Sequence, residues 1–320
     1  MKTTVLIGDV EIGYGWKPYI VAEIGINHNG DLETCFKLID AAHAAGANAV
    51  KFQRRTVPVV FSKEELDKPR EVPRWLLEAA IKRGVLTNES ISRLQSSCFM
   101  DTRNGDQKWA LEFTHEEYQE IDHYCRGKGI VWFASPWDEE SVDFLAEFNI
   151  PCYKVASASL TDDGLLRRMR SKGKPVILST GGSTMEQIRH AAQVLGQENL
   201  VILHCTAAYP KHTSAESLSM INLRVMDTLR EEFSGVPIGF SSNDGGRIPA
   251  FAAAARGAAM IEVHLTLEHA MWGSDQASSM EPVWFRDLCE WTQSLHHMLG
   301  NGQKSVYPEE VEVMKKLRRK

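Results

Sequence analysis

The sequence predicts a TIM (β/α)8 barrel (19–320) with a short N-terminal β-hairpin (1–18) and a long insertion after the second strand (54–113). Short apolar runs and helical patterns alternate eight times along the chain, and such alternation predicts a parallel sheet. Eight units favour a closed barrel over an open sheet. A doubly wound open sheet is the alternative, but no GxGxxG motif follows the first strand.

Composition narrows the class of protein. A chain of 320 residues can form one large domain or two average ones. The net charge of −6 and the pI near 6.0 argue against nucleic acid as the main partner. The six cysteines include no CxxC pair, and no stretch has the length and apolarity of a membrane span or a signal peptide. We therefore predict a soluble cytoplasmic protein that binds neither nucleic acid nor a membrane.

The N-terminal segment contains the hairpin and the first strand–helix unit. Residues 4–12 alternate in polarity around a Gly-Asp pair, which is typical of a hairpin. Residues 19–22 are continuously apolar, as in a strand that is buried on both faces. Residues 32–45 have helical spacing, and the pattern predicts Asp31 as the N-cap and Gly46 as the residue that ends the helix.

Polar and small side chains follow the first strand at alternate positions. Successive side chains of a strand point to opposite faces, so we expect Glu23, Gly25 and Asn27 on one side. An acid buried there requires a partner, because an unpaired buried carboxylate is costly.

The insertion is rich in charge and contains two short helical patterns, near 75–83 and 90–97. It separates a strand at 49–53 from a helix that opens at Thr114, where a glutamate three positions on completes a capping-box pattern. Segments of this length are usually functional covers or disordered. Because this one directly follows a strand end, we expect it to cover part of the barrel mouth.

The rest of the chain repeats the unit regularly. Strands and helices are predicted at 130–135 and 139–148, 152–157 and 163–171, 175–180 and 185–195, 200–206 and 218–233, 237–242 and 249–256, and 259–266 and 284–299. The basic run at 315–320 is too short for a nucleic-acid arm and is predicted to be a solvated tail.

The strand ends carry the residues of chemical interest, because barrel enzymes place their chemistry there. They are Glu23 and Asn27, Lys51 and Gln53, Ser135, Lys154 and Ser157, Ser179 to Gly182, His204 and Thr206, Ser241 and Asn243, and Glu262 and His264. Two lysines, several hydroxyls and a glycine-rich turn before a helix predict an anion site. A structural salt bridge is the alternative for either lysine alone.

Glu262 and His264 share one face of the last strand. A single histidine is more often a hydrogen-bonded core residue than a ligand. Beside an acid and an anion site at a barrel mouth, a metal role is favoured.

Seven stretches together resemble the sialic acid synthase family, whose members condense phosphoenolpyruvate with an unphosphorylated aldose to form nonulosonic acids. The stretches follow the family's order along the whole barrel: AEIGINHNGD (22–31), AVKFQ (49–53), WFASPWD (132–138), YKVASAS (153–159), PVILSTGGST (175–184), LHCTAAYP (203–210) and IEVHLTL (261–267).

The resemblance implies a role for each strand-end residue. It implies catalytic roles for Glu23 and Glu262, and a phosphoenolpyruvate site formed by Lys51, Lys154, Ser157, Ser179 and Ser241. It further implies sugar contacts from Gln53, Tyr209 and Asp275, and a divalent metal, Mn²⁺ before Mg²⁺ or Co²⁺, at His264 and Asn243. The expected partners are phosphoenolpyruvate and an aldose, with a homodimer left open. The insertion is expected to supply further sugar contacts.

Four departures from the family pattern bear on the activity. Asn243 stands where the seventh strand usually has a metal-binding histidine, and Ser159 stands where an acid is common. Ala207 replaces an asparagine that binds phosphoenolpyruvate in some members. The chain also stops about where the family's C-terminal antifreeze-like domain begins, so the resemblance covers the barrel domain only.

Two hypotheses follow. The first is an active synthase that uses an N-acetylmannosamine-like aldose. The second is a catalytically impaired member that binds phosphoenolpyruvate or a sugar without turnover. A phosphorylated acceptor is a weaker third alternative. Asn243 favours impairment, because a neutral amide is a poorer ligand for a transition metal than imidazole.

Overall fold

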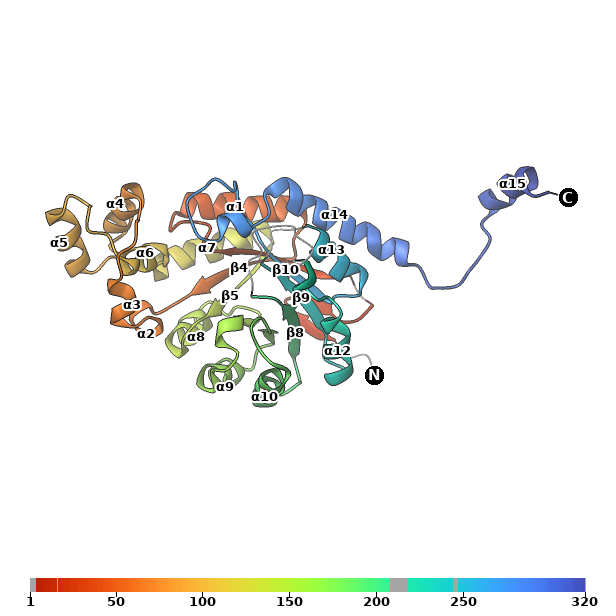
Figure 1. The fold of residues 1–320 in the computed structure, drawn as a ribbon, viewed down its shortest axis with the longest axis horizontal. Coiled ribbons are helices and arrows are strands. Elements are labelled where there is room, and N and C mark those ends of the chain that lie inside the picture. Colours follow the sequence, from red (N-terminus) through yellow and green to blue (C-terminus); the bar gives the residue numbers. More distant parts are fainter. Residues whose placement is uncertain (1–3, 16, 208–217, 244–246, 320) are drawn as a thin grey trace.

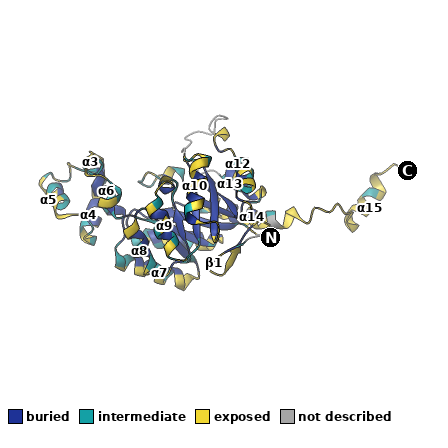
Figure 2. Ribbon diagram, turned by 90° about the horizontal axis from the view of Figure 1, so that it is seen from below, coloured by how far each residue is buried: buried dark blue, intermediate teal, exposed yellow. Residues whose placement is uncertain are grey.

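The computed structural model describes residues 4–15, 17–207, 218–243 and 247–319. Eight parallel strands close a barrel at the centre of the molecule, which confirms the predicted fold (Figure 1). Around the barrel the strands are β3 (Tyr19–Gly25), β4 (Ala49–Arg54), β5 (Val131–Pro136), β6 (Tyr153–Val155), β7 (Val176–Ser179), β8 (Leu200–Cys205), β9 (Ile238–Ser242) and β10 (Met260–His264), which returns to β3. All are buried, because helices cover the outside and side chains fill the inside (Figure 2).

The outer layer of helices follows the predicted order. It consists of α1 (Leu32–Ala45), α7 (His115–Lys128), α8 (Glu139–Ala146), α9 (Asp163–Ser171), α10 (Met185–Leu195), α12 (Val225–Glu232), α13 (Arg247–Ala255) and α14 (Pro282–Leu299). The predicted caps are confirmed: the Asp31 side chain accepts from the Thr34 amide, and Gly46 is left-handed with φ 87°. Thr114 and Glu117 form the predicted capping box.

The hairpin pairs β1 (Val5–Ile7) with β2 (Val10–Ile12), as predicted. Val5, Ile7 and Ile12 are buried in the main core, so the hairpin is packed against the barrel. Its turn residue Gly8, with φ 58°, lies against Val131 at the start of β5. The hairpin therefore lies at the N-terminal ends of the strands, opposite the predicted site.

The insertion forms five helices instead of the predicted two: α2 (Val57–Val60), α3 (Lys63–Asp67), α4 (Arg74–Arg83), α5 (Asn88–Ser96) and α6 (Asn104–Leu111). It extends to one side of the barrel (Figure 1) and has its own apolar cluster, composed of Val72, Leu76, Leu77, Ala80, Leu86, Leu94 and Ala110. Gly30, in the loop after β3, lies against the Ala110 carbonyl, and Trp272, in the loop after β10, packs on the cluster. The insertion thus borders the C-terminal face of the barrel, and its expected cover over the mouth stays a prediction.

Other boundaries differ from the prediction. The helix expected at 218–233 becomes α12 only at Val225, because Asn222 has a positive φ of 42° that interrupts helical geometry. The expected C-terminal tail contains an exposed helix, α15 (Pro308–Leu317). Among the helices of the described ranges, none combines the length and apolarity needed to cross a membrane.

Candidate functional site at the barrel mouth

Glu23 and Lys51 are directly opposite each other on β3 and β4. The Lys51 Nζ atom lies 2.7 Å from Glu23 Oε2, and both side chains are buried. Lys51 Nζ also donates to Ser135 Oγ at 3.2 Å, and Gln53 Nε2 donates to Glu23 Oε1 at 2.8 Å. The structure therefore supplies the partner that a buried Glu23 requires.

Glu262 lies between the two buried lysines. Its Oε1 atom is 3.6 Å from Lys51 Nζ and 3.4 Å from Lys154 Nζ, and it accepts from Ser241 Oγ at 3.3 Å. Four strands, β4, β6, β9 and β10, thus converge on one carboxylate. Both lysines therefore have a counter-charge within the protein, because Glu23 and Glu262 accompany them.

The neighbouring carboxylates offset the effect of burial on the pKa for one lysine but not for the other. Burial alone would lower the pKa of Lys51, but Glu23 and Glu262 outweigh it and raise that pKa. Burial lowers the pKa of Lys154, and Glu262 does not offset it. Burial would raise the pKa of Glu262, but the two lysines hold it below its usual range. Lys154 is therefore the cation that an additional negative charge would stabilise most.

Hydroxyl groups and a glycine turn lie next to Lys154 along the sheet. Ser157, in the 3₁₀ turn η1 (Ser157–Ser159), accepts from the Gly181 amide at 3.0 Å. A Cβ atom at Gly181 would come within 2.8 Å of Ser157 Oγ, so this approach requires glycine. Ser179 Oγ is buried and has no hydrogen-bond partner among the described residues. A bound anion would give this hydroxyl the hydrogen-bond partner that it lacks.

The inward face of β8 carries Cys205, which the sequence analysis missed. The expected residues turn away instead: His204 Nε2 bonds to the Ile221 carbonyl at 2.7 Å, and Thr206 Oγ1 donates to the Met220 carbonyl at 3.1 Å. Burial lowers the pKa of His204 and raises the pKa of the Cys205 thiol. All six residues of the run LVILHC are buried, so its pattern does not reveal which side chains face the barrel interior.

Glu262, His264 and Asn243 offer atoms that suit a divalent cation. Glu262 Oε2 and His264 Nδ1 are buried without a hydrogen-bond partner in the described part of the chain. Asn243 Nδ2 donates to Cys205 Sγ at 3.5 Å and to the Thr206 carbonyl at 3.3 Å. Within the described ranges, no cluster of three His, Cys, Asp or Glu side chains could hold a metal. A site here would use the amide oxygen of Asn243 in place of a third such group.

Asn27 does not join the site. Gly25 has φ 55° and interrupts the pairing register of β3, so the chain turns before Asn27. Asn27 Nδ2 instead donates to the Leu265 carbonyl and to Ser279 Oγ, both at 2.8 Å, and holds the loop after β10. The predicted sugar contact Asp275 lies in that loop, and Tyr209 lies outside the described residues.

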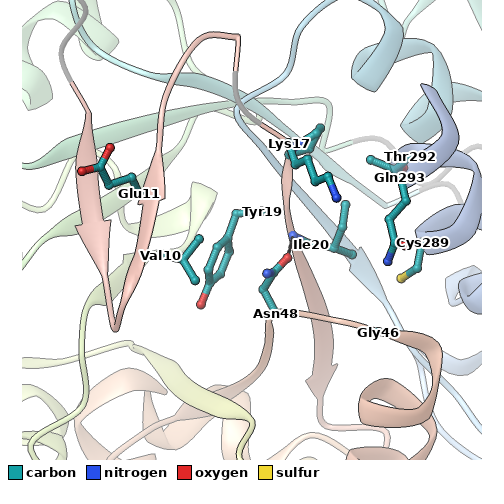
Figure 3. A pocket seen from close by; sticks show the side chains of 11 residues that line it. Val10, Glu11, Lys17, Tyr19, Ile20, Gly46, Asn48, Cys289, Thr292 and Gln293 are labelled. Atoms are coloured by element: carbon teal, nitrogen blue, oxygen red, sulfur yellow. Dashed lines mark hydrogen bonds between the residues drawn. The ribbon is translucent and has the colours of Figure 1, made fainter. Parts of the chain in front are cut away.

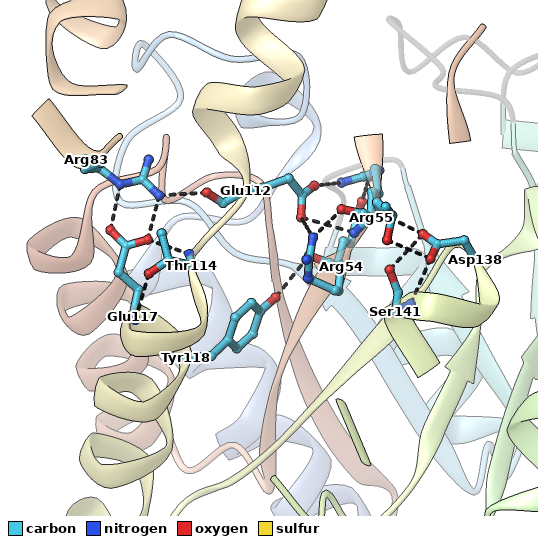
Figure 4. A network of polar contacts seen from close by, with 11 residues as sticks. Arg54, Arg55, Arg83, Glu112, Thr114, Glu117, Tyr118, Asp138 and Ser141 are labelled. Atoms are coloured by element: carbon cyan, nitrogen blue, oxygen red, sulfur yellow. Dashed lines mark hydrogen bonds and ion pairs between the residues drawn. The ribbon is translucent and has the colours of Figure 1, made fainter. Parts of the chain in front are cut away.

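A network of arginines and acids links the site to both ends of the insertion (Figure 4). Arg55 Nη2 donates to Gln53 Oε1, and Arg55 Nη1 lies 3.3 Å from Glu112 Oε1. Arg54 shares the same carboxylate, with Nη1 3.2 Å from Glu112 Oε2. Gln53 also contacts Glu23. Arg55 and Gln53 therefore connect the side chain of Glu112, at the end of the insertion, to Glu23 at the barrel centre.

A separate cavity of about 490 Å³ lies at the N-terminal end of the barrel (Figure 3). It is lined by the hairpin, the start of β3 and α14, including Glu11, Lys17, Asn48 and Gln293. Strand direction places it at the opposite end from the converging lysines, so it is distinct from the candidate site.

Comparison with known proteins shows similarity along most of the chain. The model of the NeuB family matches residues 86–304. Human N-acetylneuraminate-9-phosphate synthase is 31% identical over 301 residues, which cover 93% of this chain and 76% of that protein. The N,N'-diacetyllegionaminic acid synthase of Campylobacter jejuni is 32% identical over 299 residues, covering 92% and 81%. The crystal structure of N-acetylneuraminic acid synthetase from Leptospira borgpetersenii, in complex with citrate, has a TM-score of 0.76 at 27% identity and covers 100% and 99%.

Proposed function

The chain belongs to the NeuB family, and we propose that it condenses phosphoenolpyruvate with an aldose to give a nonulosonic acid and phosphate. The observation that carries the proposal is the convergence of Lys51 and Lys154 on Glu262, beside the unpartnered hydroxyl of Ser179. Similar relatives are named as synthases of N-acetylneuraminate 9-phosphate and diacetyllegionaminic acid. Sequence motifs favour a free, N-acetylmannosamine-like acceptor, whereas the name of the human relative indicates a phosphorylated product.

Phosphoenolpyruvate carries a carboxylate and a phosphate, and the site offers donors suited to both. Lys51 and Lys154 supply charge, and the hydroxyls of Ser157, Ser179 and Ser241 supply hydrogen bonds. Lys154 gains most, since its burial is offset only in part by Glu262. Binding places the C3 carbon of the enol at the barrel mouth, where the acceptor enters.

The reaction forms a carbon–carbon bond at C3 and a bond from C2 to the oxygen of water, and it breaks the bond from C2 to the phosphate oxygen. C3 attacks the aldehyde carbon, and the aldehyde oxygen takes up a proton to become a hydroxyl. Water adds to the cationic C2 and loses a proton, and the resulting hemiketal phosphate expels phosphate to leave a 2-keto acid. Glu23 would transfer a proton, and its burial beside Lys51 supports this role.

A divalent metal, Mn²⁺ before Mg²⁺ or Co²⁺, would polarise the aldehyde oxygen when bound. Glu262 Oε2, His264 Nδ1 and the Asn243 amide oxygen would hold it. Gln53, on β4, and Asp275, in the loop after β10, would contact the sugar.

The test is purified protein with phosphoenolpyruvate, Mn²⁺ and a panel of aldoses, monitored for phosphate and for a 2-keto acid. Formation of both products in equal amounts supports the proposal. The alternative, a catalytically impaired member, predicts that phosphoenolpyruvate binds by calorimetry while no acceptor releases phosphate. Asn243 is the observation that favours this alternative, because it leaves a weaker ligand set.

A further inference from the structure

We propose that Arg55 is a positioning residue of the barrel-mouth site: it fixes the side-chain amide of Gln53, which in turn fixes the carboxylate of Glu23. The inference rests on the proposed function, because Glu23 is the residue that would transfer the proton in that reaction. The seven stretches that carry the family resemblance do not include Arg55.

Arg55 follows the end of β4, and its side chain is held in one direction (Figure 4). Its backbone amide donates to Glu112 Oε2 at 3.1 Å, and its Nη1 atom donates to Glu112 Oε1 at 3.3 Å. The guanidinium carbon lies 4.5 Å from the centre of the Trp137 ring, in a cation–π contact. Arg55 is also buried. Because one carboxylate holds both its backbone and its side chain, the second terminal nitrogen, Nη2, has a defined position.

The Nη2 atom of Arg55 donates to Gln53 Oε1, and this contact decides which way the Gln53 amide is turned. A guanidinium group offers only donors, so the amide oxygen faces Arg55. The amide nitrogen therefore faces the opposite way, and it donates to Glu23 Oε1 at 2.8 Å. In the reversed orientation the nitrogen would face a donor and the oxygen would face a carboxylate, so both hydrogen bonds would be lost.

This series of contacts ends at the carboxylate that is proposed to transfer a proton. Glu23 Oε1 accepts from Gln53, and Glu23 Oε2 lies 2.7 Å from Lys51 Nζ, so each carboxylate oxygen has its own partner. A catalytic group acts efficiently only within a narrow range of distance and direction, and a displaced carboxylate transfers a proton slowly. Arg55 would thus affect the reaction through Gln53 and not by contact with the reacting atoms.

The neighbouring Arg54 is a matched control. It has the same charge, its Nη1 atom lies 3.2 Å from Glu112 Oε2, and its guanidinium carbon lies 4.5 Å from the centre of the Phe144 ring. Its side-chain hydrogen bonds within the described ranges go to Glu112 and to the Arg55 carbonyl, not to Gln53. A difference in activity between Arg54→Met and Arg55→Met therefore reports the contact with Gln53 and not the loss of a charge.

The experiment measures kcat and KM with phosphoenolpyruvate, Mn²⁺ and the acceptor that gives the highest activity. We expect Arg55→Met to lower kcat by about tenfold or more, with KM for phosphoenolpyruvate unchanged, and Arg54→Met to lower kcat by less than about threefold. In a Gln53→Met background, Arg55→Met should lower kcat by less than about threefold, because the amide that it positions is already absent. Arg55→Lys keeps the charge beside Glu112 but has one terminal nitrogen in place of two. It should show the same loss of kcat, and it replaces Arg55→Met if that variant does not fold.

Two results would overturn the inference. One is an equal loss of kcat in Arg54→Met and Arg55→Met, and the other is a loss in Arg55→Met that is as large in the Gln53→Met background as in the native chain. If no acceptor releases phosphate, the proposed function fails, and the side-chain amide resonance of Gln53 decides. It is recorded with isotope-labelled glutamine and assigned by its absence from Gln53→Met. A shift of this resonance in Arg55→Met but not in Arg54→Met supports the positioning role, and no shift in Arg55→Met, or an equal shift in both, contradicts it.

Discussion

Lys154 and Glu262 meet across the barrel, with the ammonium nitrogen 3.4 Å from a carboxylate oxygen and both groups buried. The contact lies between the residues proposed to bind phosphoenolpyruvate and those proposed to bind a metal. Each member of the pair is therefore expected to govern a different property, ligand binding for the lysine and stability against acid for the glutamate.

Lys154→Ala is expected to weaken the binding of phosphoenolpyruvate by about 2–5 kcal/mol, the range for removing one partner of a buried charge pair. The reason is that Lys154 is the less compensated of the two site lysines. Isothermal titration calorimetry measures the change, with Lys172→Ala, which removes a surface partner of Asp143, as the control. Unchanged affinity in both Lys154→Ala and Lys51→Ala would falsify the site.

Glu262→Gln is expected to make the stability of the protein less dependent on acid pH. The folded pKa of Glu262 lies below its usual value of 4.5, so the stabilisation is present above pH 4.5 and is lost as pH falls through the folded pKa. Urea unfolding at about pH 7 and about pH 4 measures the loss, which should be smaller for the variant than for the native chain. The exposed substitution Glu140→Gln is the control, and an equal loss in both native and Glu262→Gln chains contradicts the prediction.

Asn243→His is expected to tighten Mn²⁺ binding by about tenfold or more, because imidazole is a better donor than a neutral amide. The spin-resonance signal of free Mn²⁺ measures binding without substrates, and turnover should then need less metal. Asn88→His, at the exposed start of α5, controls for a surface histidine. Full activity of the native chain after exhaustive chelation, or an unchanged metal response in Asn243→His, argues against this site.

Arg83→Met is expected to destabilise the protein by about 1–3 kcal/mol, because it removes charged hydrogen bonds that hold the end of the insertion. The Arg83 guanidinium donates to the carbonyls of Ala110 and Glu112 at 2.8 and 2.7 Å and pairs with Glu117 at 2.6 Å (Figure 4). Arg74→Met, on the same helix, removes an exposed pair with Glu78 and the contact of the guanidinium with the Phe99 ring, and should cost less than about 1 kcal/mol. Equal effects in urea unfolding would show that the Arg83 contacts add nothing beyond a surface pair.

The barrel could be predicted from the sequence because strands that are buried on both faces are apolar runs. Residues such as Asp31 and Thr114 also mark the starts of helices. The need for a partner at Glu23 also followed from local alternation. The identity of that partner did not, because the pairing of Glu23 with Lys51 depends on the register between strands.

The predictions that differ from the structure also have local causes. Asn27 was placed with Glu23 because alternation assumes an unbroken strand, but the left-handed Gly25 ends the alternation. Cys205 was overlooked because both faces of its strand are buried and the neighbouring His204 is the more polar side chain. Three helices of the insertion are short, and short elements give too few turns for a periodic pattern.

Trp272 joins two segments that are far apart in sequence. Its ring packs edge-on against Trp75 of the insertion at 6.5 Å, while its carbonyl accepts from Asn29 in the loop after β3 at 2.8 Å. The loop that carries Asp275 is thereby fastened to the insertion as much as to the barrel. We expect this loop and the insertion to open as one cooperative unit. The amide protons of residues 272–276 should therefore exchange with solvent at the same rate as those of α4 and α6, and faster than those of β10.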